Sequence, residues 1–548
     1  MYHTAWRARV AGAAIIILLT LAAYLPALQG KFLWDDEFWT TDIAGLLRDV
    51  HGLYSIWFHP TALPQQYFPL AATSFWIDYQ LWGFWTTPYH VENVLLHILS
   101  ALLFWRLLRR LQVPGAWLAA AIFALHPVMV ESVAWITERK NVLSLVLFPA
   151  ALLAYGRFTP YWKEQSNSSP RRWGAYAVAF ILFAAALLAK TTAFSLPAVI
   201  LLICWWKRGT IRRADILPTL PFFAASIVFC LVAAWFEKNH IGAKGPAWEI
   251  SFPERCLIAG RAIWFYAGKL LWPANLCFIY PRWRLSAGSW RQWLYPIGAV
   301  AVLLALWLAR ARIGRGPLTA GLFFVGTLFP ALGFTNAYFM RYSFVCDHWT
   351  YLSSLGLIAL AAALVTRLAE YFRAPVLLGG FTAVLLAVLA ILTCRQSAIY
   401  ADPESLWGDT VAKNPGAWVA QLDLGVLLSQ QGRSPEGIAH YEAALQTNPD
   451  DPDAHNDLGF ALKLRGENNE AIEQYDQALR LDPDFPPALI NRGIALDDLG
   501  RHSEAIACYE RLLRSDPDYP GVQGLLAKSR AILAARAAAG TPSPPTLR

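Results

Sequence analysis

The chain has 548 residues and a net charge of +8; 56% of its residues are apolar and only 15% are charged. Soluble domains carry about 25% charged residues, so this composition excludes an ordinary soluble protein and indicates membrane-spanning segments. The basic residues lie mostly in short stretches between apolar runs, which argues against nucleic-acid binding. Seven cysteines without a CxxC pair suggest neither a zinc site nor a disulfide framework.

Eleven apolar runs precede residue 395, and a transmembrane helix needs roughly 20 mostly apolar residues. The first run is longer than the core of a signal peptide and has no clear cleavage site, so we expect it to remain as a span. Four of the runs are shorter than a full span. The expected spans are 10–28, 91–111, 117–133, 142–155, 173–189, 193–206, 217–235, 295–309, 318–335, 351–365 and 376–393.

The loops between these spans differ in charge, and basic loops are typically cytoplasmic. With eleven spans, the outer loops are 29–90 and 236–292, and the segment after Arg395 is also outside. Residues 256–273 are apolar enough for a twelfth span, although Arg261 and Lys269 favour an interfacial or re-entrant helix. The basic loops, which fall on the other face, contain Arg7, Arg9, Arg106, Arg109, Arg110, Arg157, Lys163, Arg171, Arg172, Lys207, Arg208, Arg212, Arg213, Arg310, Arg312, Arg315, Arg367 and Arg373.

After Arg395 the chain becomes polar and repeats with a period of 34 residues. Proline recurs at 415, 449, 483 and 517, glycine at 425, 459 and 493, and tyrosine at 441, 475 and 509. The stretch DLGFALKLRGENNEAIEQYDQALRLDP resembles the tetratricopeptide repeat, a helix–turn–helix unit of this period. We expect a domain over 396–535 with repeats at about 416–449, 450–483 and 484–517, a capping helix after Tyr519 and a disordered tail, 536–548.

Such repeats stack into a solenoid with a concave face that binds peptides or protein surfaces. Three repeats are the minimum that buries a continuous core. The alternative is that the repeats only brace the membrane domain.

Three adjacent acids, Asp35, Asp36 and Glu37, follow the first span in the stretch GKFLWDDEFW. A carboxylate at this boundary can stay hydrated, so one interpretation is a polar cap on a helix end. Aromatic neighbours would instead partly desolvate the acids and raise their pKa, which makes a carboxylate a better base. These neighbours are Phe32, Trp34, Phe38 and Trp39.

Other ionisable residues are expected on the same face of the membrane. Arg139 and Lys140 follow the third span and Lys190 ends the fifth, although solvated charge at a helix end, or snorkelling in the case of Lys190, would also explain them. Ionisable groups within spans are candidates for function, although a histidine there is more often a packing residue. The remaining candidates near these spans are His90, His97, His126, Glu131 and Glu138.

Five stretches of the chain are similar to one family. They are FLWDDEFW, YFPLAATSFWIDYQLWG, PYHVENVLLHILSALLFWRLL, FALHPVMVESVAWITERKNVLSLVLF and LLAKTTAFSLP. They resemble bacterial relatives of the transmembrane and tetratricopeptide-repeat O-mannosyltransferases, which are glycosyltransferases of the GT-C fold. The resemblance implies an all-α fold with a polytopic GT-C domain over 1–395 and an α-solenoid behind it. It also implies a polyprenyl-phosphate monosaccharide as the sugar donor.

The resemblance implies roles for several residues. Asp35 or Asp36 would take the proton of the acceptor hydroxyl, and Asp35 is favoured because the first acid of the related Asp-Glu pair does so in the O-mannosyltransferases. The hydroxyl would then attack the anomeric carbon with inversion. The leaving lipid phosphate would be stabilised by Arg139, Lys140 and Lys190. No metal is expected, because relatives with lipid-monophosphate donors generally do without one, although the outer acids could bind a divalent ion.

One stretch departs from the family pattern. Animal members carry a sequence like ERYLYLPS where this chain has CDHWTYLSS, so that Asp347 and His348 replace a Glu and an Arg. If that Arg contacts the donor, the donor or its binding mode differs here. We therefore add Asp347 and His348 to the candidate site residues and do not assume mannose.

The sequence thus predicts a multi-pass glycosyltransferase of the bacterial inner membrane that modifies Ser or Thr of a protein held by periplasmic repeats. An enzyme of the same fold that acts on a glycan or a lipid remains open, as does a non-catalytic scaffold whose repeats recruit envelope proteins. A transporter is disfavoured, because the chain lacks the paired broken segments typical of transporters. The expected partners are membrane lipid, the lipid-linked donor and a protein acceptor, without nucleic acid.

Overall fold

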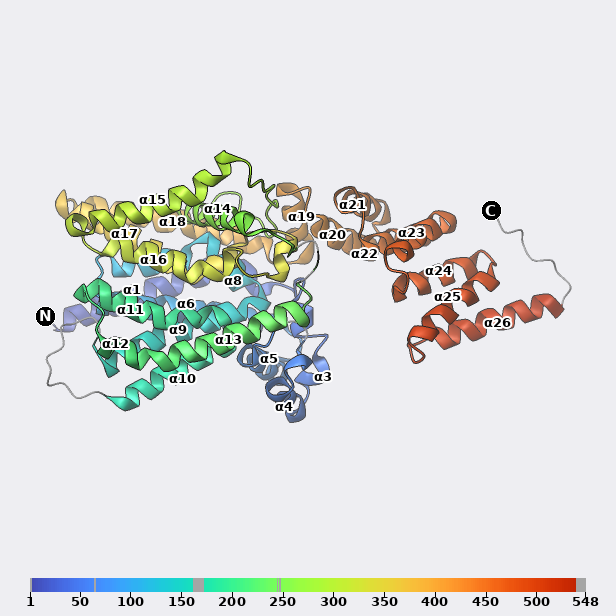
Figure 1. Cartoon of the computed structure of the whole chain (residues 1–548), viewed down its shortest axis with the longest axis horizontal. Coiled ribbons are helices and arrows are strands. Elements are labelled where there is room, and N and C mark those ends of the chain that lie inside the picture. The colour runs from blue at the N-terminus through green and yellow to red at the C-terminus, as the bar shows by residue number, and fades with distance from the viewer. Residues whose placement is uncertain (1, 64–65, 161–171, 244, 246–247, 539–548) are drawn as a thin grey trace. The chain divides into compact units, whose positions relative to one another are not determined.

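The computed structural model describes residues 2–63, 66–160, 172–243, 245 and 248–538 (Figure 1). In this part of the chain every regular element is a helix, which confirms the expected all-α fold. The chain divides into two compact units, Met1–Leu406 and Trp407–Arg548. Lys163 and Arg171, expected in a basic loop, lie outside the described residues, as do residues 539–548 of the expected tail.

The helices of the first unit follow one another in the order of the apolar runs (Figure 1). They are α1 (Tyr2–Tyr24), α2 (Asp36–Trp39), α3 (Ala44–Leu47), α4 (Val50–Phe58), α5 (Pro69–Trp82), α6 (Thr86–Arg110), α7 (Ala116–Leu125), α8 (Val130–Ala134), α9 (Arg139–Phe158), α10 (Trp173–Ala189), α11 (Leu196–Arg208), α12 (Arg213–Ile216), α13 (Leu220–Asn239), α14 (Phe252–Leu271), α15 (Trp290–Ile313), α16 (Gly316–Leu328), α17 (Ser354–Tyr371) and α18 (Pro375–Ile399). Within this unit α9 packs between α6 and α10, α17 packs against α7 and α16, and α14 packs against α15.

In the part of the chain that the structure describes, seven segments are long enough and apolar enough to cross a membrane, and each matches an expected span. The bent pair α7 and Pro127–Ala134, which turns by 56°, would be an eighth. The other three expected spans correspond to α10, α11 and α16, helices of only 13 to 17 residues. The seven segments are Trp6–Gln29, Thr86–Arg110, Ile136–Phe158, Arg213–Asn239, Trp290–Ile313, Ser354–Tyr371 and Pro375–Ile399. The helices are thus those of a multi-pass membrane protein, while the side on which each loop lies remains a prediction.

Several long helices of this unit are interrupted near one end. Residues with extended backbone, His126, Trp135 and Lys190, separate consecutive helical segments. Pro127 explains the first break, because a proline disfavours the helical conformation of the residue before it. Short 3₁₀ turns follow the breaks and provide the polar residues described below; they are η3 (Pro127–Met129), η4 (Ile136–Glu138) and η5 (Thr191–Ser195), with η10 (Asp347–Thr350) in front of α17.

The second unit is a stack of helix pairs. The border expected after Arg395 falls within α18, and α19 (Pro403–Lys413) runs through the residue at which the two units divide. Each expected repeat contains one pair, and α26 continues through residues 536–538, which were expected in the tail. The helices are α20 (Trp418–Gln430), α21 (Ser434–Thr447), α22 (Pro452–Leu464), α23 (Asn468–Leu481), α24 (Pro486–Asp498), α25 (His502–Ser515) and α26 (Val522–Ala538).

Glycines at two repeated positions explain the packing of each pair. In the second repeat a Cβ on Gly459 would lie only 2.7 Å from the ring of Tyr475, so only glycine lets α22 approach α23 this closely. Gly466 has a φ of +85°, a conformation that favours glycine, and it reverses the chain between the two helices. Both relations recur in the repeats before and after, 34 residues away.

Candidate functional site

Buried charged side chains gather on the short segments between the long helices of the first unit. Asp36, Glu131, Glu138 and Arg139 each expose at most 1% of their surface. A buried charge is costly unless it is paired or hydrogen-bonded, so the partners of each group determine what the cluster can do.

Asp36 connects the loop after α1 to the η4 turn. Its Oδ1 accepts hydrogen bonds from the backbone N–H and the hydroxyl of Thr137, both at 2.6 Å, and its Oδ2 accepts one from the N–H of Leu33 at 2.8 Å. Burial raises the pKa of Asp36 to about 7 and the neighbouring Asp35 adds to the rise, whereas the hydrogen bonds from Thr137 and Leu33 oppose it. With both oxygens engaged, Asp36 fixes the position of its neighbour Asp35.

Asp35 and Glu37, the acids on either side, differ in their surroundings. Asp35 exposes only 7% of its surface, whereas Glu37 is exposed. The negative charge of Asp35 attracts the ammonium group of Lys140, more strongly than Asp36 does. Asp35 and Asp36 are thus both buried and both attract Lys140, and the attraction of Asp35 is the larger.

Glu138 joins the cations from two different segments. Its Oε1 lies 3.1 Å from Nζ of Lys140, and its Oε2 lies 3.0 Å from Nζ of Lys190 and also accepts a hydrogen bond from the side chain of Asn141. Glu138 and both lysines are at least nine-tenths buried. The structure thus brings Asp35, Lys140, Glu138 and Lys190 together, and we call these four residues the charged row.

Arg139, by contrast, faces another group of residues. Its Nη1 lies 2.5 Å from both Asp78 and Glu92, its Nε donates to Asn93 at 2.8 Å, and its Nη2 donates to the carbonyl of Tyr89 at 2.8 Å. These partners engage all three guanidinium nitrogens. The structure therefore does not bring Arg139 into the charged row, and its contacts are those of a residue that joins α5, α6 and α9.

A second polar group surrounds His348 on the η10 turn. Nδ1 of His348 lies 2.6 Å from Oε1 of Glu131, and Nε2 lies 3.4 Å from Sγ of Cys346, while Asp347 accepts a hydrogen bond from the hydroxyl of Tyr280 at 2.9 Å. Burial lowers the pKa of His348 to about 3. Among the described residues, Glu131, Cys346 and His348 are the group whose donor atoms lie close enough to hold a metal, within 4.8 Å of one another.

The other three histidines proposed from the sequence have packing contacts. His97 hydrogen-bonds to the hydroxyl of Tyr351 at 2.7 Å, and His126 hydrogen-bonds to the carbonyl of Leu270 at 3.0 Å. His90 is fully buried against Gly30, where a Cβ would lie 2.7 Å from Nε2. These contacts agree with the alternative stated from the sequence, in which such histidines are packing residues.

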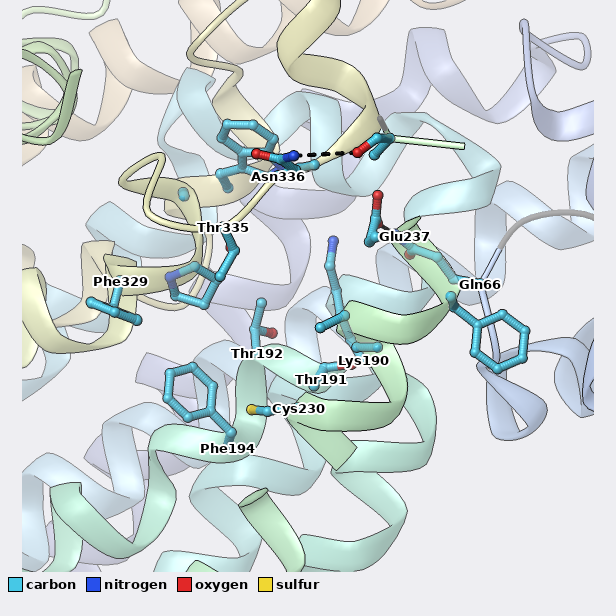
Figure 2. Close-up of a pocket in the computed structure, with 18 of the residues that line it drawn as sticks. Gln66, Lys190, Thr191, Thr192, Phe194, Cys230, Glu237, Phe329, Thr335 and Asn336 are labelled. Carbon is cyan, nitrogen blue, oxygen red and sulfur yellow. Dashed lines mark hydrogen bonds between the residues drawn. The ribbon is translucent and has the colours of Figure 1, made fainter. Parts of the chain in front are cut away.

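A cavity of about 660 Å³ adjoins the charged row (Figure 2). Lys190 and His348 line it, whereas Asp35 and Lys140 lie outside its wall. Figure 2 shows Lys190 extending toward Glu237 and Asn336, and Glu237 accepts a hydrogen bond from Gln66. The cavity therefore has a polar end beside the charged row.

The other end of the cavity is apolar. Phe194, Cys230 and Phe329 line it (Figure 2), and a second cavity of about 550 Å³ shares Phe194, Cys230 and Thr327 with it. The second cavity is lined mostly by apolar residues of α11, α13 and α16. Together the two cavities form a space that is polar beside the charged row and apolar between α11, α13 and α16.

Sequence reasoning missed three partners of two site residues. Asp78 and Glu92, which hold Arg139, and Cys346, which contacts His348, were not among the expected residues. The signal for Asp78 was a single acid within the aromatic stretch SFWIDYQ, because an acid in such surroundings needs a cation nearby.

Comparisons with known proteins agree with both parts of the structure. Models of the tetratricopeptide repeat match residues 404–452, 422–484 and 462–529. The protein O-mannosyl-transferase F38B6.6 of Caenorhabditis elegans is 23% identical over 79% of this chain and 62% of its own length. The protein O-mannosyl-transferase TMTC1 of Homo sapiens is 24% identical over 80% of this chain and 55% of its own length. The protein O-mannosyl-transferase TMTC4 of Mus musculus is 26% identical over 78% of this chain and 65% of its own length.

The chain spans between 55% and 65% of the length of these relatives. Most of the aligned part is the membrane unit, which holds the charged row and the cavity. The chain is therefore similar over about four fifths of its length to proteins named protein O-mannosyl-transferases, and it ends in tetratricopeptide repeats.

Proposed function

We propose that the protein is a glycosyltransferase that moves a sugar from a lipid-linked donor to a hydroxyl group of a protein. The observation that carries this proposal is the charged row beside a cavity whose other end is apolar. The similarity to protein O-mannosyl-transferases over most of the chain supports the class of reaction.

A polyprenyl-phosphate sugar fits the cavity by its chemistry. Its phosphate is an anion, and charge-assisted hydrogen bonds from an ammonium group such as Lys190 stabilise such groups. Its hydrocarbon chain matches the apolar passage that begins at Phe194 and continues between α11, α13 and α16. The buried lysines would stabilise the negative charge that grows on the phosphate as the sugar leaves.

Asp35 is the proposed general base. It would take the proton of the acceptor hydroxyl while that oxygen attacks the anomeric carbon in line, which inverts the configuration of the sugar. A base must lie within hydrogen-bonding reach of the proton that it removes. The Asp36–Thr137 hydrogen bonds hold the segment that carries Asp35, and the charge of Asp35 attracts Lys140. Lys140 and Glu138 connect this base to Lys190 at the donor end.

The repeats are the proposed binding site for the protein acceptor. Stacked tetratricopeptide repeats present a continuous concave surface, and three pairs with a capping helix are present here. Their acceptor would be an exported protein, with the membrane unit in the inner membrane of a bacterium and the repeats on the periplasmic side.

The test is transfer of a labelled sugar in membranes that contain the full chain. Membranes with wild type, Asp35→Asn and Glu37→Gln receive a labelled polyprenyl-phosphate sugar, with mannose and glucose tested in parallel, and labelled protein is measured. We expect transfer by wild type and by the Glu37 variant, and a loss of at least 100-fold in Asp35→Asn. Equal transfer by Asp35→Asn and wild type would exclude the base assignment, and label found only in glycan or lipid would exclude a protein acceptor.

A further inference from the structure

Three polar side chains from different parts of the chain line the polar end of the cavity. Gln66 precedes α5, Glu237 lies in the last turn of α13, and Asn336 precedes the short turn η9 (Tyr338–Arg341). Lys190 extends toward Glu237 and Asn336 (Figure 2). We call Gln66, Glu237 and Asn336 the polar wall, and none of them has a part in the proton transfer or the phosphate contact proposed above.

Hydrogen bonds within the protein hold the polar wall in place. Glu237 accepts one from the side chain of Gln66 and another from the backbone N–H of Tyr338 at 3.0 Å. The amide oxygen of Asn336 accepts a hydrogen bond from Nη2 of Arg255 at 2.7 Å. Side chains that are already held in position lose little conformational entropy when a ligand binds to them, which favours binding.

These bonds leave the polar wall with further hydrogen-bonding capacity. An ionised carboxylate offers about four acceptor positions, and an amide group offers two donor hydrogens. The partners of the half-buried Glu237 that the structure describes are both uncharged, and Lys140 adds a smaller electrostatic attraction. A hydroxyl group that donates to a carboxylate forms a charge-assisted bond, which is stronger than a bond between neutral groups. The polar wall therefore suits a ligand with several hydroxyl groups.

We propose that the polar wall binds the hydroxyl groups of the donor sugar and that Glu237 selects an uncharged sugar. The proposal rests on the proposed function, because the contact of Lys190 with the donor phosphate is what places the sugar beside Glu237. The cavity volume of about 660 Å³ lies within the range of about 300–1,000 Å³ that is typical of small-molecule sites. A uronic acid differs from its hexose by a carboxylate at C6, and the negative charge of Glu237 would repel that carboxylate.

The experiment measures the affinity of the purified full chain in detergent for three lipids of equal chain length. They are a polyprenyl-phosphate hexose, the corresponding uronic acid, and polyprenyl methyl phosphate, a phosphodiester without a sugar; glucose and mannose are tested in parallel. For the hexose that wild type binds more tightly, we expect the uronic acid form to bind at least about 10-fold more weakly. Glu237→Gln should weaken binding of this hexose lipid at least about 5-fold, because a charge-assisted bond becomes a neutral one. Its affinity for the methyl phosphate should stay that of wild type, and its discrimination against the uronic acid should be lost.

Two further variants separate the sugar contact from other effects. Lys190→Met should weaken binding of the hexose lipid and of the methyl phosphate alike, whereas Glu37→Gln, which makes the same change at an exposed acid, should bind all three lipids as wild type does.

Two results would overturn the proposal and leave the proposed function standing. One is wild type that binds the uronic acid lipid as tightly as the hexose lipid, a comparison that needs no variant and so does not depend on the folding of Glu237→Gln. The other is a folded Glu237→Gln variant with wild-type affinity for the hexose lipid. Wild type that binds neither the hexose lipid nor the methyl phosphate would contradict the proposed function together with this proposal.

Discussion

At the scale of single residues, neighbouring charges in this chain have different partners. Asp35 and Asp36 are adjacent, yet Asp36 accepts three hydrogen bonds while Asp35 interacts with Lys140. Arg139 and Lys140 are also adjacent, but Arg139 joins helices whereas Lys140 belongs to the charged row. In each pair one residue, Asp36 or Arg139, stabilises the fold, and the other, Asp35 or Lys140, belongs to the charged row.

Replacing Arg139 by methionine should destabilise the protein. The change leaves Asp78 and Glu92 without the guanidinium that contacts both at 2.5 Å, and breaking a buried pair costs about 3–5 kcal/mol. Thermal unfolding in detergent measures the loss. Arg367→Met is the control, because the Arg367–Glu370 pair is exposed and such pairs contribute at most about 1 kcal/mol; similar losses in both variants would show that Arg139 has no structural role.

The pH dependence of stability should carry a contribution from Asp36. Burial raises its pKa to about 7 in the folded state, compared with 3.8 for an unperturbed aspartate. Between these values the folded protein binds a proton that the unfolded chain does not, so the free energy of unfolding should fall as the pH rises from about 4 to 7. Asp36→Asn removes this titrating group. Between pH 4 and 7 the melting temperature of Asp36→Asn should therefore fall less than the melting temperature of wild type. Parallel curves for wild type and Asp36→Asn would contradict the shift, and Glu37→Gln should leave the wild-type slope unchanged.

At the scale of elements, the breaks in the helices create the site. In a continuous helix the backbone groups form hydrogen bonds with one another and the side chains point outward. The turns at η4, η5 and η10 instead bring Glu138, Lys190 and His348 toward one another. In the second unit the opposite holds, because unbroken helices pack in pairs through repeated glycines. The polar contacts of the membrane unit thus lie on irregular segments, whereas the repeats consist of regular helices that pack in pairs.

Gly459→Ala should loosen the second repeat. The added Cβ would lie 2.7 Å from the ring of Tyr475, and such overpacking costs about 1–3 kcal/mol. Amide hydrogen exchange in α22 and α23 of the full chain should become faster. In the control Gly524→Ala, nothing lies within 4 Å of the added Cβ, and a helix gains up to about 1 kcal/mol from such a change. Unchanged exchange in Gly459→Ala would contradict the close packing.

Some of these elements could be predicted from the sequence and others could not. What decides is how far apart along the chain the interacting residues lie. The 34-residue period and the aromatic neighbours of Asp35 are local, and they are visible in one sequence. The partners of Arg139 lie 47 and 61 residues away, and Glu131 lies 217 residues from His348. No local spacing connects such residues, so the Arg139 and His348 groups could not be assembled, although single members were identified.

At the scale of the whole molecule, charge divides along the chain. Residues 407–538 contain twenty acidic and twelve basic residues, although the net charge of the chain is +8. The basic excess therefore belongs to the membrane unit. The orientation expected from the short basic loops, with the repeats on the outer side, remains a prediction.

Reporter fusions test this orientation. Alkaline phosphatase joined after residue 538 should be active in the periplasm of a bacterial host, and the same enzyme joined after residue 208, behind the basic end of α11, should be inactive. Two inactive fusions would show that an even number of spans lies between residues 208 and 538, as an additional span through α14 would make it. The opposite pattern would show that the whole orientation is inverted.

The most direct measurement of the proposed mechanism separates donor binding from transfer. Affinity for a polyprenyl-phosphate sugar and the rate of a single turnover are measured for wild type, Asp35→Asn and Lys190→Met. Loss of a charge-assisted hydrogen bond costs about 1.5–3 kcal/mol, so Lys190→Met should bind the donor at least 10-fold more weakly. Asp35→Asn should bind it as wild type does, with transfer slowed at least 100-fold. Wild-type affinity in Lys190→Met together with a wild-type rate in Asp35→Asn would contradict the account.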